Sequence, residues 1–353
     1  MSKTYSHGDY LYTLERDGWN VVLNKKVTDR NRTTYGEILS EIDNIPVTNM
    51  LETFRDCTAL KEAPAIPESV KNMLSTFFGC KSLKTAPSMP EGLQYMEHTF
   101  ANCTSLVKAP TIPQGVEFIT GAFMNCTSLT EAPIIPKGVK YMAGTFWGCE
   151  SLTTAPAIPE SVKDMALTFR DCTSLTKAPA IPESVEDMKR TFDSCTSLTE
   201  APVILKGIEE LEGTFINCTS LAKAPVIPEG VKNMSGTFED CTALKEAPVI
   251  PDGVEDLLST FYGCTSLAEA PIIPESVKDM RFAFAGCTSL TKAPAIPEGV
   301  EHKDGIFDGC NALKTAECRK PSLSEQITSA KEKSKQQSNS ERQIKDGLGI
   351  NNR

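Results

Sequence analysis

Apolar side chains recur along the chain with a fixed period of 23 residues. Cysteine marks the period most plainly, because twelve of the thirteen cysteines stand at positions 57, 80, 103, 126, 149, 172, 195, 218, 241, 264, 287 and 310. A phenylalanine precedes each of these cysteines by three residues, and a leucine follows each by three. A second apolar pair keeps the same phase, as in Val162 and Met165. A fixed period of this kind indicates an array of structural repeats.

The period predicts that each repeat forms one coil of a solenoid. A single coil cannot bury its apolar side, so neighbouring coils stack and equivalent residues form inward-facing rows. Two prolines in stretches such as Ala178–Pro182 exclude a helix, and an extended turn around a corner is expected instead. About twelve coils, spaced by about 4.8 Å, would give a rod or an arc. The expected fold is therefore a β-rich repeat solenoid.

The amino-acid sequence of the repeat resembles that of a known family. The stretch SLTTAPAIPESVKDMALTFRDC, which ends at Cys172, is similar to the BspA-like leucine-rich repeats of bacterial surface proteins and some protist proteins. Those repeats share the order of leucine, proline-containing corner, Val-x-x-Met, phenylalanine and cysteine. The resemblance covers about residues 47–318 and implies adhesion or partner binding on a curved sheet, without catalytic residues. It also implies export, since the family's surface members usually carry a signal sequence.

The pattern divides the chain into an N-terminal cap (1–46), a solenoid of about twelve repeats (47–318) and a C-terminal tail (319–353). Within the cap, Tyr10–Leu14 and Asn20–Lys26 are expected to form a β-hairpin, followed by a partial repeat. The tail holds eight Lys or Arg against four Asp or Glu. This composition predicts a flexible, largely disordered segment that is helical in part, around Leu323–Lys335.

Charge and hydropathy limit the partners and the location. The net charge of -10 and the pI of about 5.1 argue against a nucleic-acid binder, which would carry a basic stripe. The chain contains no run of 18 apolar residues, so no membrane span is expected. The N-terminal residues lack the basic and apolar regions of a Sec signal. We therefore expect a cytoplasmic protein or one exported by a signal-independent route, and only the family resemblance suggests the cell surface.

The repeated cysteines are expected to be buried free thiols. A zinc site would need paired ligands at short spacing, such as C-x-x-C, and the chain has none. Disulfides between neighbouring coils are within geometric reach, but an inward row points every sulfur the same way. Small apolar thiols would fill the core and suit a reducing compartment. We expect neither a metal nor another cofactor.

Some positions of the repeat vary from copy to copy while the repeated Phe, Cys and Leu stay constant. These variable positions are the candidates for binding. Two residues after the valine, three consecutive repeats carry Tyr95, Phe118 and Tyr141. Later repeats mostly carry carboxylates there, as in Asp164 and Asp187, so the position is expected to be exposed. Exposed apolar clusters usually mark contact surfaces, and aromatic residues are their common anchors.

A second variable position directly follows the repeated phenylalanine. It holds Phe78, Met124 and Trp147, which would extend the aromatic patch if this position faces the same side. The sequence leaves an alternative open, in which all these residues fill gaps under loops or vary without function.

No catalytic constellation emerges from the sequence. The three histidines, His7, His98 and His302, lie far apart, and no Ser-His-Asp or Cys-His arrangement can be assembled. The expected function is non-enzymatic binding of a macromolecule, with a protein as the expected partner. The alternative is a translocated bacterial effector that binds a host protein through the solenoid, and an enzyme ranks last.

Overall fold

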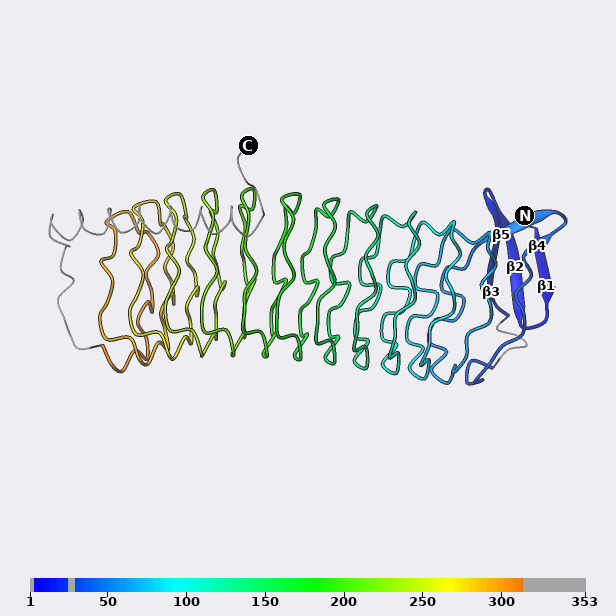
Figure 1. Ribbon diagram of the computed structural model, residues 1–353, viewed down its shortest axis with the longest axis horizontal. Coiled ribbons are helices and arrows are strands. Elements are labelled where there is room, and N and C mark those ends of the chain that lie inside the picture. The colour runs from blue at the N-terminus through cyan, green and yellow to red at the C-terminus, as the bar shows by residue number, and fades with distance from the viewer. Residues whose placement is uncertain (1–2, 25–28, 314–353) are drawn as a thin grey trace, which may run out of the picture.

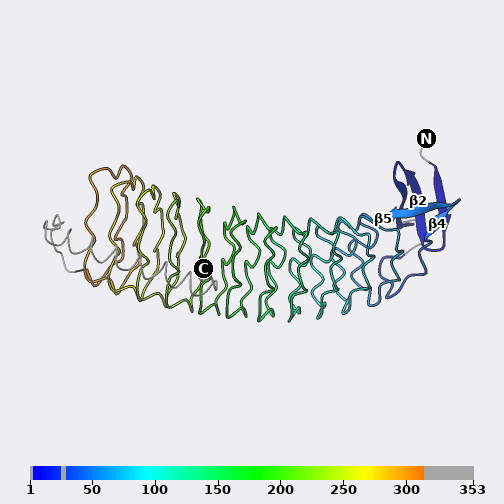
Figure 2. The ribbon, with the colours of Figure 1, turned by 45° about the horizontal axis from the view of Figure 1, so that its top comes forward.

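The chain forms an elongated stack of coils that lie side by side, with five strands at its N-terminal end (Figure 1). The computed structural model describes residues 3–24 and 29–313. A turned view shows that the stack is gently curved (Figure 2). Within the described residues there is no α-helix, so none is long and apolar enough to cross a membrane.

A small sheet begins the stack. Its strands are β1 (Thr4–His7), β2 (Tyr10–Glu15), β3 (Gly18–Leu23), β4 (Glu41–Ile42) and β5 (Ile45–Asn49), in the spatial order β1-β2-β3-β5-β4. β2 and β3 form an antiparallel hairpin, and β3 pairs with β5 in parallel. The side chains alternate in and out along β2 and β3, so that Tyr10, Tyr12, Trp19 and Val21 are buried on one face.

This sheet covers the N-terminal end of the core. The indole N–H of the buried Trp19 donates a hydrogen bond to the carbonyl of Ile42 at 3.1 Å. The ring of Tyr10 packs edge-on against Phe54, with 6.2 Å between the ring centroids. β5 pairs with β3 and also, through Asn49, with the next coil. The predicted boundary between the N-terminal cap and the solenoid, after residue 46, falls inside β5. This boundary therefore stays a proposal.

Isolated parallel bridges join the coils beyond β5, in place of long strands. Prolines interrupt each coil, and so do residues in the left-handed conformation. The residue before each repeated cysteine always has a positive φ: Asp56, Gly79, Asn102, Asn125, Gly148, Asp171, Ser194, Asn217, Asp240, Gly263, Gly286 and Gly309. Only Gly, Asn, Asp and Ser occur there, and Gly, Asn and Asp are the residues that most readily adopt this conformation.

The repeated phenylalanines form one continuous stack through the core. From Phe54 to Phe307, neighbouring ring centroids lie 5.3 to 5.9 Å apart, with nearly parallel planes. All but Phe307, in the last coil, are fully buried. Burying one such ring stabilises the fold by roughly 1.5–3 kcal/mol. The predicted inward rows of Phe, Cys, Leu, Val and Met are confirmed.

A buried row of threonines lies beside the phenylalanines. The Oγ1 of Thr145 is 3.0 Å from the carbonyl oxygen of Ile119 in the preceding coil and 2.6 Å from that of Met142 in its own coil. Both carbonyl oxygens also accept a backbone N–H, from Ala122 and from Thr145, so the buried hydroxyl satisfies its own donor on acceptors that are already paired. Ala122, Ala283 and Ile306 replace this threonine in three coils.

One series of parallel bridges starts at Asn49 and joins equivalent residues of successive coils. It is interrupted once. Equivalent residues pair from Asn49 to His302 in the described coils, except between Asp187 and Glu210. The coil of Glu210 is the one in which Leu205 replaces the second proline of the corner. A proline fixes φ and shapes the corner. The interruption is local, because the N–H of Arg190 still donates to the carbonyl of Glu212 and that of Phe192 to the carbonyl of Thr214 in the regular register.

The expected fold class, a β-rich leucine-rich-repeat-like solenoid, is confirmed. Within residues 3–24 and 29–313, regular strands are confined to the N-terminal sheet. The predicted flexible or partly helical tail (319–353) and Cys318 lie outside the described residues.

Candidate functional site

Three aromatic side chains form an exposed stack on the outside of the solenoid. We call Tyr95, Phe118 and Tyr141 the aromatic ladder. Parallel bridges join the three residues in consecutive coils. The ring centroids of Tyr95 and Phe118 lie 6.2 Å apart, and those of Phe118 and Tyr141 5.2 Å apart, with planes within 17° of parallel. Tyr95 is 43% exposed and Tyr141 39%, while Phe118 between them is half-buried.

Most other coils place Asn or Asp at the ladder position, and their side chains have a structural task. The Oδ1 accepts a hydrogen bond from the backbone N–H two residues further along, which forms an Asx turn. Seven coils make this bond: Asn49–Leu51, Asn72–Leu74, Asp164–Ala166, Asp187–Lys189, Asn233–Ser235, Asp256–Leu258 and Asp279–Arg281. A phenyl ring has no acceptor for it. The aromatic ladder therefore forgoes a bond that stabilises by about 0.5–1.5 kcal/mol in each coil.

The stacking determines which parts of the rings a partner can touch. Nearly parallel rings turn their faces toward each other, so the inner faces are covered. The ring edges, and the phenol hydroxyls of Tyr95 and Tyr141, remain for a partner. Ring edges carry a partial positive charge and hydroxyls can donate hydrogen bonds. The aromatic ladder thus presents apolar edges with two polar groups.

The aromatic ladder continues into carboxylates. Tyr141 bridges to Asp164, and Asp164 bridges to Asp187. Burial raises the pKa of the Asp164 carboxyl above its usual value, the N–H of Ala166 opposes this, and the negative charge of Asp187 raises the pKa further. The two carboxylates therefore repel each other on a partly dehydrated surface, which favours a positively charged group beside them.

The second group of candidates, Phe78, Met124 and Trp147, is half-buried. No ring contact joins Trp147 to Tyr141, or Phe78 to the ladder, among the described ring pairs. The structure thus does not bring these residues into ring contact with the aromatic ladder. Their role in binding stays a prediction.

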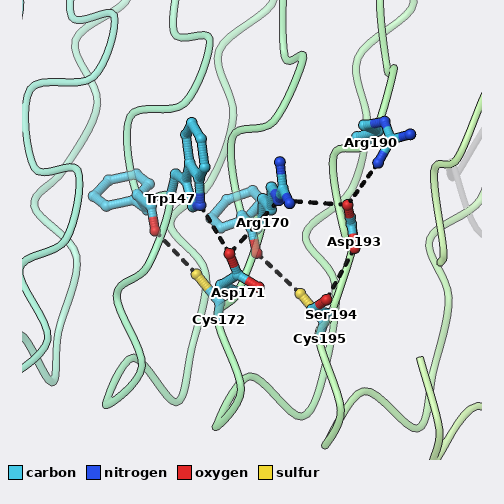
Figure 3. A network of polar contacts seen from close by, with 10 residues as sticks. Trp147, Arg170, Asp171, Cys172, Arg190, Asp193, Ser194 and Cys195 are labelled. Carbon is cyan, nitrogen blue, oxygen red and sulfur yellow. Dashed lines mark hydrogen bonds and ion pairs between the residues drawn. The ribbon is translucent and has the colours of Figure 1, made fainter. Parts of the chain in front are cut away.

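Cationic side chains cover two of these rings. The guanidinium of Arg55 lies 4.6 Å from the ring centroid of Phe78, and that of Arg170 lies 4.8 Å from the ring centroid of Trp147. The indole N–H of Trp147 also donates to Asp171 at 2.8 Å (Figure 3). Trp147 is therefore engaged within the protein and starts a polar network.

The network centres on Asp193, which is only 2% exposed. One carboxylate oxygen lies 3.4 Å from Nε of Arg170 and 3.2 Å from a guanidinium nitrogen of Arg190, and the other accepts a hydrogen bond from Ser194 (Figure 3). A buried carboxylate needs such partners, because an unpaired charge in the interior is strongly unfavourable. The network joins neighbouring coils, and the buried Nε of Arg170 lies within ion-pair distance of Asp171 and Asp193 without a hydrogen bond to either.

The twelve cysteines of the repeat are buried free thiols, as predicted. Burial raises their pKa, to about 12 for Cys103 and for Cys287. No group of three or more His, Cys, Asp or Glu that could hold a metal ion occurs within residues 3–24 and 29–313. A thiol that stays protonated is a poor nucleophile and a poor ligand.

The sequence analysis missed a second exposed surface, which we call the apolar ridge. It consists of Val203, Val226, Val249 and Ile272, which are 46–55% exposed. They are the third residues of four consecutive corners that begin Ala-Pro-x-Ile, of which the first ends in Leu205 and the other three in proline. Tabulating this variable position, as for the other two, would have found it. The signal is weak, since Val and Ile also fill the core rows.

Comparison with protein families and structures agrees with this architecture. The family model described as the BspA type leucine rich repeat region (6 copies) matches residues 47–153, 142–268 and 235–340. No curated protein matches the chain. Among solved structures, the chain is similar to a leucine-rich repeat protein from Bacteroides ovatus ATCC 8483, with 22% identity, a TM-score of 0.59, and coverage of 88% of this chain and 93% of that chain. At this identity the likeness concerns the fold alone.

Proposed function

The chain belongs to the BspA-type leucine-rich repeat family, and on that premise we propose that it is a non-enzymatic module that binds a protein partner through the aromatic ladder. Proteins of this family are generally non-enzymatic and are consistent with protein binding or adhesion. One observation carries the proposal. In three consecutive coils the exposed Tyr95 and Tyr141 and the half-buried Phe118 replace the Asn or Asp that caps the local turn in seven other coils. Departures from the local structural preference are expected at functional surfaces.

The orientation of the rings supports a protein as the partner. Nucleobases bind aromatic side chains by stacking on a ring face, and in the aromatic ladder the inner faces are already covered. Aliphatic side chains can pack along ring edges, and backbone carbonyls can accept from Tyr95 and Tyr141. Both groups are abundant on protein surfaces.

The neighbouring carboxylates define the partner further. Asp164 and Asp187 continue the aromatic ladder in the next two coils. A partner that covers the rings therefore meets negative charge directly beside them. We propose an apolar strip flanked by Lys or Arg as the complementary surface, because opposite charges across an interface steer association and fix its register.

The location of the chain is a separate proposal. BspA-type proteins are often at the cell surface or exported. An adhesin would use the aromatic ladder outside the cell, and a translocated effector would use it on a host protein. An export assay separates these two cases, and variants of the aromatic ladder test both.

Asparagine replacement gives a sharp test of the aromatic ladder. The variant Tyr95→Asn/Phe118→Asn/Tyr141→Asn removes the rings and restores the side chain that Asn49, Asn72 and Asn233 use in other coils. The matched control is Tyr262→Asn, because Tyr262 is 41% exposed but lies outside the aromatic ladder.

The wild type, the ladder variant and the Tyr262→Asn control serve as bait under identical conditions. Each protein that they capture is quantified by mass spectrometry. We expect one partner to be recovered with the wild type and the control, and at least tenfold less with the ladder variant. Equal recovery by a folded ladder variant would show that the partner uses another face. Loss of folding would place the rings in the core.

A further inference from the structure

The apolar ridge has no structural task within the coils that carry it. At the same corner position, other coils have small or polar residues: Ala65, Ser88, Thr111, Ala157, Ala180 and Ala295. Only Ile134, which is 86% exposed, resembles the ridge residues, and it stands alone. Four consecutive exposed Val or Ile side chains form an apolar strip, and such strips on soluble proteins are usually covered by a partner.

An acidic row borders the apolar ridge. Three residues after Val226, Val249 and Ile272 stand Glu229, Asp252 and Glu275, all exposed. Beside Val203 the same position holds Lys206, so the acidic row borders the three C-terminal members of the ridge. Most other coils also carry Glu at this position, and Gln114 and Lys137 are exceptions. A segment that covers the apolar ridge should therefore combine apolar side chains with positive charge.

The chain's own C-terminal residues have this composition. Residues 319–353 hold 8 Lys or Arg and 4 Asp or Glu, whereas residues 1–318 hold 28 and 42. Leu323, Ile327, Ile344 and Leu348 supply apolar side chains. The segment is thus the basic part of an otherwise acidic chain.

The C-terminal residues are also long enough to reach the apolar ridge. They follow Leu313, which is the last residue that the structure describes. Val203, at the far end of the ridge, lies about five coils back, or roughly 25 Å at the usual spacing. A segment of 40 residues spans about 60 Å even if it is fully helical, and more if it is extended.

We propose that residues 319–353 bind back on the apolar ridge of the same chain. Their apolar side chains cover Val226, Val249 and Ile272, and their Lys and Arg residues face the acidic row. This contact is independent of the aromatic ladder. It covers the second apolar strip within the molecule and leaves the aromatic ladder as the surface for an external partner.

The test compares proteolysis of the C-terminal residues in full-length variants. The variant Val226→Ser/Val249→Ser/Ile272→Ser removes the apolar ridge with a residue that Ser88 shows to be compatible with the corner. Ile134→Ser is the matched control, since it removes an exposed isoleucine far from the ridge. Trypsin cleavage within 319–353 is timed by mass spectrometry against a synthetic peptide of the same residues.

We expect the wild type and the control to be cleaved at least tenfold more slowly than the peptide, and the ridge variant at the rate of the peptide. Zero-length crosslinking should join lysines of the segment to Asp252 or Glu275. Cleavage of the wild type at the rate of the peptide overturns the proposal, and so does protection that persists in the ridge variant. Protection that rises with protein concentration overturns it too, because a second copy would then cover the ridge.

Discussion

The sulfur of Cys80 lies 3.2 Å from the carbonyl oxygen of Phe54, the phenylalanine of the preceding coil. The same contact recurs along the solenoid as far as Cys310 and Phe284, at 3.0 Å. Each thiol thus donates a weak hydrogen bond to a backbone acceptor one coil back. This direction points every sulfur at a carbonyl instead of at the next sulfur, which explains why a row of stacked cysteines remains unbridged.

Thiol reactivity should follow this burial. We expect the Cys318→Ser protein to show almost no reaction with a thiol reagent in its native state and twelve reactive groups after denaturation. Burial raises the pKa of these thiols, so few are present as the reactive thiolate at neutral pH. Cys310, in the last described coil, should react first, because it is 8% exposed and the others are fully covered. Disulfides between successive coils, such as Cys172–Cys195, would contradict this account.

Alanine and asparagine should differ at the aromatic ladder. Tyr95→Ala with Tyr141→Ala should abolish partner binding and leave the solenoid folded, because both rings are half-exposed. The corresponding asparagine pair should also lose binding but be more stable than the alanine pair by about 1 kcal/mol, since Asn can accept the N–H two residues on. Thermal unfolding of both variants gives the comparison. Equal stability of the two would refute the turn-capping role.

The contributions of Asp164 and Asp256 to stability should fall as the pH rises above about 4. Burial raises the pKa of Asp164 and of Asp256 in the native state, and the nearby carboxylates of Asp187 and Asp279 raise them further. Between the unfolded and the native pKa, the native state then binds more protons than the unfolded state, so raising the pH through this window destabilises the protein. Asp164→Asn with Asp256→Asn should raise the melting temperature at pH 7 and flatten its dependence on pH.

Asp279→Asn is the control of opposite sign at the same ladder position. Burial tends to raise the pKa of Asp279, but hydrogen bonds from Arg281, at 2.6 and 3.0 Å to one carboxylate oxygen, outweigh it and the pKa is lowered. This ion pair stabilises the native state above the unfolded pKa and is lost as the pH falls through the native one. Asp279→Asn should therefore lower the melting temperature at pH 7. A higher melting temperature in both the double variant and Asp279→Asn would mean that net charge alone governs the effect.

Residues whose backbone has the left-handed conformation offer a test of backbone strain. Leu167 has a φ of 58°, and the equivalent Gly144 has the same value. A left-handed conformation costs a non-glycine residue about 1–2 kcal/mol, and glycine costs about 0.5–1 kcal/mol in chain entropy. Leu167→Gly should therefore be more stable than Leu167→Ala by about 0.5 kcal/mol, because both variants lose the half-buried leucine side chain, and Gly144→Ala should destabilise. The Cβ added at Gly144 meets nothing nearer than 4.0 Å, so any loss there is conformational. Thermal melts should place Leu167→Gly above Leu167→Ala and Gly144→Ala below the wild type.

The periodic part of the fold could be predicted from sequence because equivalent residues of identical coils must lie side by side. The Phe, Cys and Leu rows follow from this rule, and so does the contact between Tyr95 and Phe118. The N-terminal residues do not follow the 23-residue period, and their structure was harder to predict. The hairpin of β2 and β3 was expected from its alternation, whereas β1 has no such alternation, and all four of its residues are exposed.

The buried threonine row illustrates a second limit. Thr145 and its equivalents look like ordinary polar positions beside the phenylalanine. Their hydroxyls are buried because the coils stack closely enough for one side chain to reach two backbone carbonyls. A polar residue buried for this reason cannot be told from an exposed one by its hydropathy.

The sequence by itself determined which residues meet along the solenoid, since a constant period places residues 23 apart in contact whatever the shape of the coil. Only the tertiary structure decided which residues meet around a coil. Between Tyr141 and Trp147 the chain passes through Gly144, whose positive φ turns the backbone, so the in-and-out alternation of an extended strand no longer applies. Trp147 therefore joins Arg170 and Asp171, and not the aromatic ladder.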